Sequence, residues 1–159
     1  VSIKHGREVQ MPGQAPTLHS VGCMAHIQKF EQVQPTLFRV VCQGGLRFKL
    51  DNPIVGNLGV WQGDVTYLAQ DPSTEVPAHL QAYADRLGKV IASAQRQGVI
   101  DELSIFPPYQ LDQCGWLANR YAEALPVSVD AKLQLLSELD PLQRLKSVIR
   151  LMQDENSDR

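Results

Sequence analysis

The feature that most constrains the fold is an alternation of apolar and polar residues between Gly22 and Asp51. A period of two places every second side chain on the same face of a β-strand. Gly44 and Gly45 interrupt the alternation, and glycine adopts the backbone angles of tight turns at little steric cost. The stretch therefore predicts three short strands with a hairpin turn at Gly44-Gly45. The expected apolar faces are Cys23, Ala25 and Ile27; Phe38, Val40 and Cys42; and Leu46, Phe48 and Leu50.

Shorter strand signals lie on either side of this stretch. Val1–Lys4 is predicted as a brief strand, and residues 6–16 as a loop because they hold two glycines and two prolines. Residues 32–35 are expected to join the first two strands of the alternating stretch, since Pro35 is disfavoured inside a central strand. Residues 52–59 are predicted as a loop, followed by a strand over Val60–Leu68. Gly63 inside that strand predicts a bulge or a close backbone approach.

The apolar period changes from two to about 3.6 after residue 75, which is typical of helices. Pro77 suits the first turn of a helix that Gly98 is placed to end. Three more helices are expected, with Asp112, Ser128 and Asp140 as their caps. The expected buried rows are Leu80, Ala84, Leu87, Ile91 and Ala94; Leu117, Tyr121 and Leu125; Leu133, Leu136 and Leu139; and Leu142, Leu145, Ile149 and Met152, with Val148 at the edge.

The order of these elements, strands first and helices last, predicts the α+β class. We expect a small antiparallel barrel or sheet over residues 1–70 and an α-helical bundle over residues 76–153. The polar tail, residues 154–159, is expected to fray.

Composition excludes several classes of protein. The net charge of −2 gives no electrostatic case for binding nucleic acid, whose phosphates need clustered Lys and Arg. No stretch approaches the roughly 20 apolar residues of a membrane span, and no signal-peptide pattern is present. The cysteines, Cys23, Cys42 and Cys114, are odd in number and form no CxxC motif, which favours reduced thiols in a cytoplasmic protein. A cross-strand disulfide between Cys23 and Cys42 is the alternative.

The sequence carries no recognisable pattern for catalysis or metal binding. Gly88-Lys89 lacks the spacing of a phosphate-binding loop, and no serine lies in a GxSxG turn. The histidines have no zinc-ligand spacing among themselves or with cysteine. We therefore predict no catalytic residues, no metal and no cofactor.

Five segments carry a pattern in their order along the chain: VGCMAHI at 21–27, GLRFKL at 45–50, DVTYL at 64–68, LANRYAEALP at 117–126 and KLQLLSELDPLQRL at 132–145. Taken in order, they resemble the amino-terminal domain of Lon proteases, and more closely the free-standing bacterial proteins made of that domain alone. No single segment is specific, but the ordered set covers nearly the whole chain. The family usually has Thr at the position of Cys23, and it normally opens with a strand and a short helix before the strand at Val1.

The resemblance implies a PUA-like antiparallel β pseudo-barrel followed by a C-terminal α-helical bundle. It also implies a non-catalytic role, the recognition of unfolded or tagged polypeptide for a protease. RNA binding is the alternative, because PUA-like barrels elsewhere hold RNA, but the charge of this chain argues against it. Since the family's opening segment is absent and the chain starts at Val1, we expect either some tens of upstream residues in the native protein or a pairing strand from elsewhere.

An apolar loop at Leu103–Tyr109 is the most suggestive surface, because Pro107-Pro108 bars regular structure there. Its rings either fill the joint between barrel and bundle or offer a patch for an extended peptide. The candidate polypeptide-contact residues are Trp61, Tyr67, Phe106, Tyr109 and Trp116.

Overall fold

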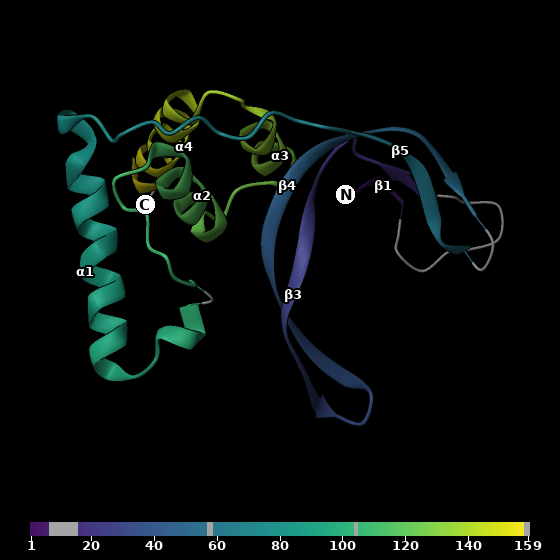
Figure 1. Cartoon of the computed structure of the whole chain (residues 1–159), viewed down its shortest axis with the longest axis horizontal. Coiled ribbons are helices and arrows are strands. Elements are labelled where there is room, and N and C mark those ends of the chain that lie inside the picture. The colour runs from purple at the N-terminus through teal and green to yellow at the C-terminus, as the bar shows by residue number, and fades with distance from the viewer. Residues whose placement is uncertain (7–15, 57–58, 104, 158–159) are drawn as a thin grey trace. The chain divides into compact units, whose positions relative to one another are not determined.

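The computed structural model describes residues 1–6, 16–56, 59–103 and 105–157. It divides into two compact units, a β unit over Val1–Gln70 and a helical unit over Asp71–Arg159 (Figure 1). In the described part of the chain, the β-strands lie in the β unit and the α-helices lie in the helical unit. This arrangement confirms the predicted α+β class.

The β unit contains two antiparallel sheets. Strands β1 (Ile3–His5) and β2 (Thr17–Leu18) form a small pair. Strands β3 (Val21–Gln34), β4 (Leu37–Val55) and β5 (Trp61–Tyr67) form a sheet in that order. The described strands thus stay in two separate sheets, and closure into a pseudo-barrel remains a prediction.

The predicted hairpin turn at Gly44-Gly45 is wrong. Strands β3 and β4 are 14 and 19 residues long, and the chain reverses at Pro35-Thr36 instead (Figure 1). Both glycines lie inside β4, where the register shifts between the Cys23–Arg47 and Ala25–Gly44 pairs. A Cβ on Gly45 would come within 2.5 Å of His26 Nε2, so this glycine makes room for a cross-strand imidazole rather than turning the chain.

The predicted loop over residues 52–59 is also wrong in its first part. Strand β4 continues through Val55, and its register with β5 shifts between Asp51 and Ile54. Asn52 has a positive φ of 50°, which fits a bulge, and a bulge tolerates the proline at position 53. Opposite this bulge, a Cβ on Gly63 would lie 2.7 Å from Leu50 Cδ1, which confirms the predicted close approach.

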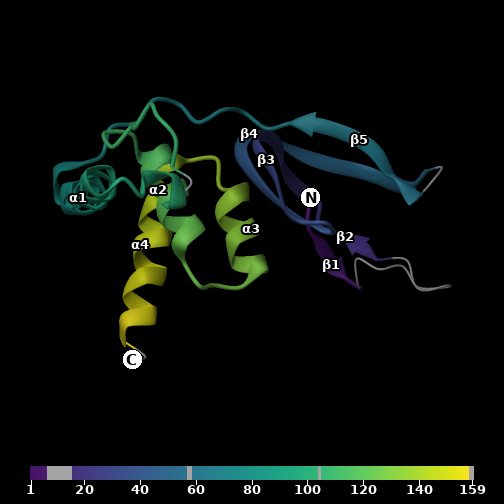
Figure 2. The same ribbon diagram turned by 90° about the horizontal axis from the view of Figure 1, so that it is seen from below.

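The helical unit begins with a 3₁₀ turn, η2 (Ala78–Leu80), that leads into α1 (Gln81–Gln97). A second 3₁₀ turn, η3 (Ile100–Leu103), and an irregular segment precede α2 (Cys114–Ala124). Helices α3 (Val129–Ser137) and α4 (Pro141–Ser157) follow. Within this unit α2 packs chiefly on α4 (Figure 2). Helix α4 includes residues 154–157 of the predicted frayed tail, because extending a formed helix costs little per residue.

Three of the predicted helix ends agree with the structure. Gly98 ends α1 in the left-handed conformation with φ 71°. Ser128 Oγ accepts a hydrogen bond from Ala131 N at 3.2 Å, and Asp140 Oδ1 accepts one from Leu142 N at 2.8 Å. The predicted Asp112 cap is wrong, because α2 begins after Gln113 and that cap residue makes no side-chain hydrogen bond to it.

The buried core lies in the helical unit, where α2 and α4 supply its completely buried side chains. The expected rows of α1, α2 and α4 are buried or half-buried, but Val148 is fully buried rather than at the edge. In α3 the buried leucine is Leu135, whereas Leu139 is 48% exposed because the helix ends at Ser137. The core cluster is Leu80, Ala84, Cys114, Leu117, Ala118, Leu125, Leu135, Leu145, Val148 and Ile149.

Candidate functional site

The five predicted contact residues are divided between the two units. Trp61 and Tyr67 are the first and last residues of β5, and each is paired across to β4. Phe106 and Tyr109 lie in the segment before α2, and Trp116 lies in its first turns. Of these five, the structure brings Tyr109 and Trp116 into ring contact.

Tyr109 and Trp116 form the centre of a cluster on the helical unit. Their rings meet edge to face, with centroids 6.4 Å apart and an interplanar angle of 67°. Gln95 of α1 donates a hydrogen bond to the Tyr109 hydroxyl at 3.4 Å, which ties the segment before α2 to α1. Both rings are half-buried, so each keeps some surface for a ligand.

Arg120 completes this cluster, and the sequence reasoning missed it. Its guanidinium lies over the Trp116 ring, 5.9 Å from the centroid, and its Nη2 donates to Glu123 Oε1 at 2.6 Å. Trp116 and Arg120 are four residues apart on α2, a spacing that places both side chains on one helix face. This spacing in the sequence would have identified the pair. We call Tyr109, Trp116, Arg120 and Glu123 the aromatic–arginine cluster.

The inner face of α2 fixes the position of this cluster. Leu117 and Ala118 are completely buried against the core. Tyr121 donates a hydrogen bond from its hydroxyl to Tyr83 O at 2.8 Å, and burial raises the pKa of this phenol. Cys114 at the start of α2 donates to Glu75 O at 3.3 Å, and burial raises the pKa of its thiol. Both groups therefore stay neutral and serve packing rather than reaction.

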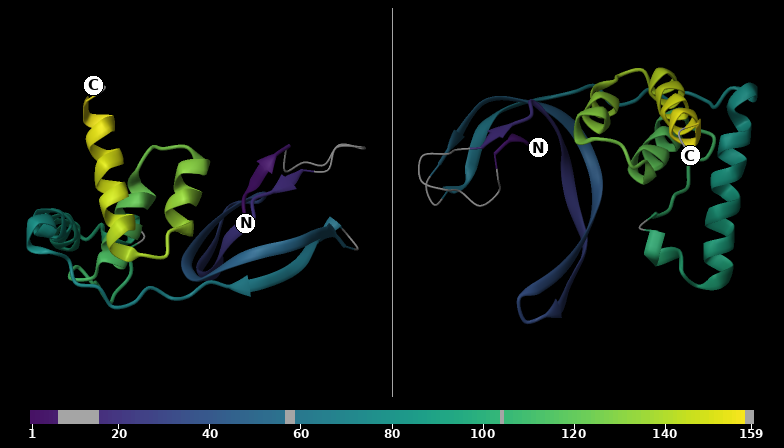
Figure 3. Two further views of the ribbon diagram at one scale, coloured as in Figure 1. Left: turned by 90° about the horizontal axis from the view of Figure 1, so that it is seen from above. Right: turned by 180° about the vertical axis from the view of Figure 1, so that it is seen from behind.

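A second accessible surface lies on the β unit. Strand β5 pairs with β4 only between Phe48 and Val55, so the β3–β4 hairpin continues beyond it as a two-stranded arm (Figure 3). We define the arm as residues 27–42. Its large apolar side chains are unusually accessible, and stacked Phe30 and Phe38, with centroids 5.1 Å apart, lie among them. The exposed fractions are 64% for Ile27, 60% for Phe30, 50% for Val33, 52% for Leu37, 47% for Phe38 and 46% for Val40.

The two faces of the arm differ in character. The Phe30–Val40 and Gln32–Phe38 pairs share one face, while the Glu31–Arg39 pair lies on the other. On that second face Lys29 Nζ lies 2.8 Å from Glu31 Oε1, and Arg39 Nη1 lies 3.9 Å from Glu31 Oε2. The hydrogen bond from Lys29 lowers the pKa of Glu31. The arm thus has an aromatic face and a charged face.

Comparison with known proteins identifies the family. Residues 3–154 match the family described as the ATP-dependent protease La (LON) substrate-binding domain. The chain belongs to this family. Curated protein sequences contain no match to the chain.

Solved structures of Lon N-terminal domains share the fold. A Lon N-terminal domain protein from Xanthomonas campestris aligns with a TM-score of 0.62 at 24% identity, over 83% of this chain and 68% of that one. The N-terminal domain of a Mycobacterium avium complex Lon protease aligns with a TM-score of 0.52 at 23% identity, over 85% of this chain and 70% of that one.

The described residues show neither a metal-ligand group nor a disulfide. Among them, no group of three or more His, Cys, Asp or Glu side chains could hold a metal ion. The three cysteines are free thiols, and the register sets Cys42 opposite Ile27, so the alternative disulfide to Cys23 is not formed. None of the helices in the described part of the chain is long and apolar enough to cross a membrane.

Proposed function

We propose that this chain is a non-catalytic polypeptide-recognition module that binds unfolded or extended protein segments. The observation that carries the proposal is the match to the Lon substrate-binding domain over residues 3–154. The free thiols also fit a reducing, cytoplasmic setting.

The aromatic–arginine cluster supplies suitable chemistry on the helical unit. Half-buried Tyr and Trp rings offer large contact area at a low cost in side-chain entropy, and Arg adds hydrogen-bond donors for peptide carbonyls or carboxylates. We assign Tyr109 and Trp116 as central contacts and Phe106 as a neighbouring one. Trp61 and Tyr67 are the proposed contacts on the β unit, where Tyr67 is 55% exposed.

Binding of this kind differs from RNA binding in its response to salt. Contacts made mainly by rings and aliphatic groups bury apolar area, and salt screens them little. RNA binding releases counterions, so its affinity falls steeply as salt rises. The net charge of −2 favours the first behaviour.

The proposal is tested with a fluorescein-labelled, unfolded peptide rich in apolar and aromatic residues, and with a labelled single-stranded RNA of similar mass. Fluorescence anisotropy at about 50 and 300 mM NaCl should give a peptide Kd that changes less than about threefold, because little counterion is released. Trp116→Ala should weaken peptide binding by about tenfold or more if this ring is a central contact.

Val129→Ala is the matched control, because Val129 is 55% exposed on the same unit and lies on α3 outside the cluster. This variant should bind the peptide like the parent chain. Tight, salt-sensitive RNA binding without peptide binding would reverse the assignment. Equal losses in Trp116→Ala and Val129→Ala would exclude the aromatic–arginine cluster as the contact surface.

A further inference from the structure

The chain that connects the two units is held by an arginine on each side. On the β side, Leu68 N donates a hydrogen bond to Arg47 O at 2.9 Å, one residue beyond the end of β5. The Arg47 guanidinium then donates from Nη2 to Ala69 O at 3.3 Å. The connection therefore stays attached to the β unit as far as Ala69.

On the helical side, the first residue of the unit is held by a partly buried ion pair with an arginine that is itself buried. Arg144 of α4 is 1% exposed and donates two hydrogen bonds to the Asp71 carboxylate, from Nη1 to Oδ2 at 2.6 Å and from Nη2 to Oδ1 at 2.8 Å. Its remaining donors are also used. Nε donates to Leu135 O at 3.1 Å, Nη2 donates to Glu138 O, and Nη1 lies 3.4 Å from Asn119 Oδ1. The guanidinium of α4 thus joins Asp71 to the end of α3, through Leu135 and Glu138, and to Asn119 in the middle of α2.

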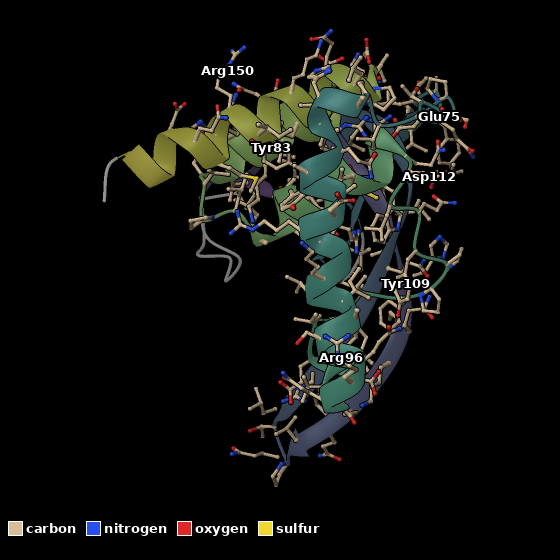
Figure 4. The ribbon with its side chains drawn as sticks, turned by 90° about the vertical axis from the view of Figure 1, so that its left-hand side faces the viewer. Glu75, Tyr83, Arg96, Tyr109, Asp112 and Arg150 are labelled. Carbon is tan, nitrogen blue, oxygen red and sulfur yellow. The ribbon has the colours of Figure 1, made fainter. Side chains whose placement is uncertain are left out.

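Residues 74–76 are hydrogen-bonded to the residues at the start of α2. Thr74 N donates to Gln113 Oε1 at 3.1 Å, and Cys114 N donates to Thr74 O at 2.8 Å. Val76 N donates to Asp112 O at 2.8 Å, and Glu75 and Asp112 accordingly lie close together in Figure 4. Gly115 leaves the space that Asp71 occupies, because a Cβ there would overlap Asp71 Oδ2.

We propose that Arg47 and Arg144 confine the joint between the two units to Gln70. Leu68 and Ala69 then move with the β unit, and Asp71–Val76 move with the helical unit. A single residue contributes only two soft backbone dihedrals, so the joint is a pivot and not a flexible tether. This inference uses only the contacts of the connecting chain and does not rest on the proposed function.

The effect of the Asp71–Arg144 pair on the position of the connecting chain can be separated from its effect on the free energy of unfolding. Removing one partner of a buried pair leaves an uncompensated charge and is strongly destabilising, whereas replacing both partners by apolar groups is often neutral. A double variant, Asp71→Ala with Arg144→Met, therefore removes the fastening without leaving a buried charge. It keeps the proposal testable if Asp71→Ala alone fails to fold.

Hydrogen exchange followed by NMR on the full chain tests the pivot. In the parent chain, Gln70 N should exchange at least tenfold faster than Leu68 N and Val76 N. In the double variant, exchange at Thr74 N and Val76 N should rise at least tenfold, while the amides of Val148 and Ile149 in α4 keep the parent rates. Arg47→Met removes the guanidinium bond to Ala69 O but keeps the backbone bond from Leu68 N to residue 47. It should therefore speed exchange at Leu68 N by less than tenfold and leave Val76 N unchanged.

Asp140→Ala is the control for a general loss of stability. This variant removes the cap of α4, because Asp140 Oδ1 accepts from Leu142 N and Gln143 N, but it leaves the Asp71–Arg144 pair in place. Its melting temperature should fall while Thr74 N and Val76 N keep their protection relative to α4. Parent-like protection of Val76 N in the double variant, or slow exchange at Gln70 N in the parent chain, would overturn the proposal.

Discussion

Replacing Leu145 with Ala should destabilise the helical unit strongly. Leu145 lies on α4 and is completely buried, as are Leu117 on α2 and Val148 on α4. All three belong to the core cluster of this unit. Truncating such a side chain removes buried methyl groups and leaves a cavity that the surrounding helices fill only in part.

The expected cost lies in the upper part of the usual range. Leu→Ala in a core costs about 2–5 kcal/mol, and the larger values occur where the site collapses least. Leu145 shares the core cluster with residues that are themselves without solvent access, on two helices that pack on each other. We therefore expect about 3–5 kcal/mol, which at the lower end is a change of roughly 150-fold in the folding equilibrium, since 1.36 kcal/mol is tenfold.

Urea unfolding followed by circular dichroism at 222 nm measures this cost, because the α-helices of the described chain all lie in the helical unit. With a denaturant slope of about 1.5 kcal/mol/M, a loss of 3 kcal/mol lowers the midpoint by about 2 M. Leu139→Ala is the matched control, because Leu139 is 48% exposed and lies between α3 and α4. A Leu145→Ala midpoint equal to that of Leu139→Ala would refute the assigned helix phase.

Two further predictions concern thiol access and catalysis. In native protein a thiol-alkylating reagent should modify exposed Cys42 first. Cys114 should react only as the helical unit unfolds, because it is buried and its burial raises the pKa of the thiol. Mass spectrometry of timed samples checks the order, and early labelling of Cys114 would contradict it. The isolated chain should neither hydrolyse ATP, as measured by phosphate release, nor cleave casein, as measured by gel electrophoresis. Turnover that persists through purification to homogeneity would show a catalytic site that the sequence does not reveal.

The helical unit was predictable from the sequence because its signals are local. A stripe at 3.6-residue spacing determines which face of α1 is buried, and Gly98 and Asp140 act through neighbouring backbone groups. Leu139 was misassigned because a repeating leucine pattern does not show that α3 stops at Ser137.

The β unit and the site were less predictable because their determinants are non-local. Gly45 resembles a turn residue in sequence, but its role depends on His26 across the sheet. Arg144 appears in sequence as one more charge on α4, and only the fold brings Asp71 to it. Arg120 was within reach of sequence reasoning, since its contact with Trp116 follows from helical spacing.

The two units distribute their apolar residues in opposite ways, and this bears on how a bound segment would be recognised. The helical unit holds the buried aliphatic side chains of the core and leaves the Tyr109 and Trp116 rings half-buried beside Arg120. The arm leaves Phe30, Phe38 and Val40 accessible on one face and keeps Lys29, Glu31 and Arg39 on the other. A polypeptide lying on the aromatic face would therefore meet rings and methyl groups while the charges remain in solvent. Recognition at either surface would depend on the apolar area that is buried, which gives both units the same weak dependence on salt.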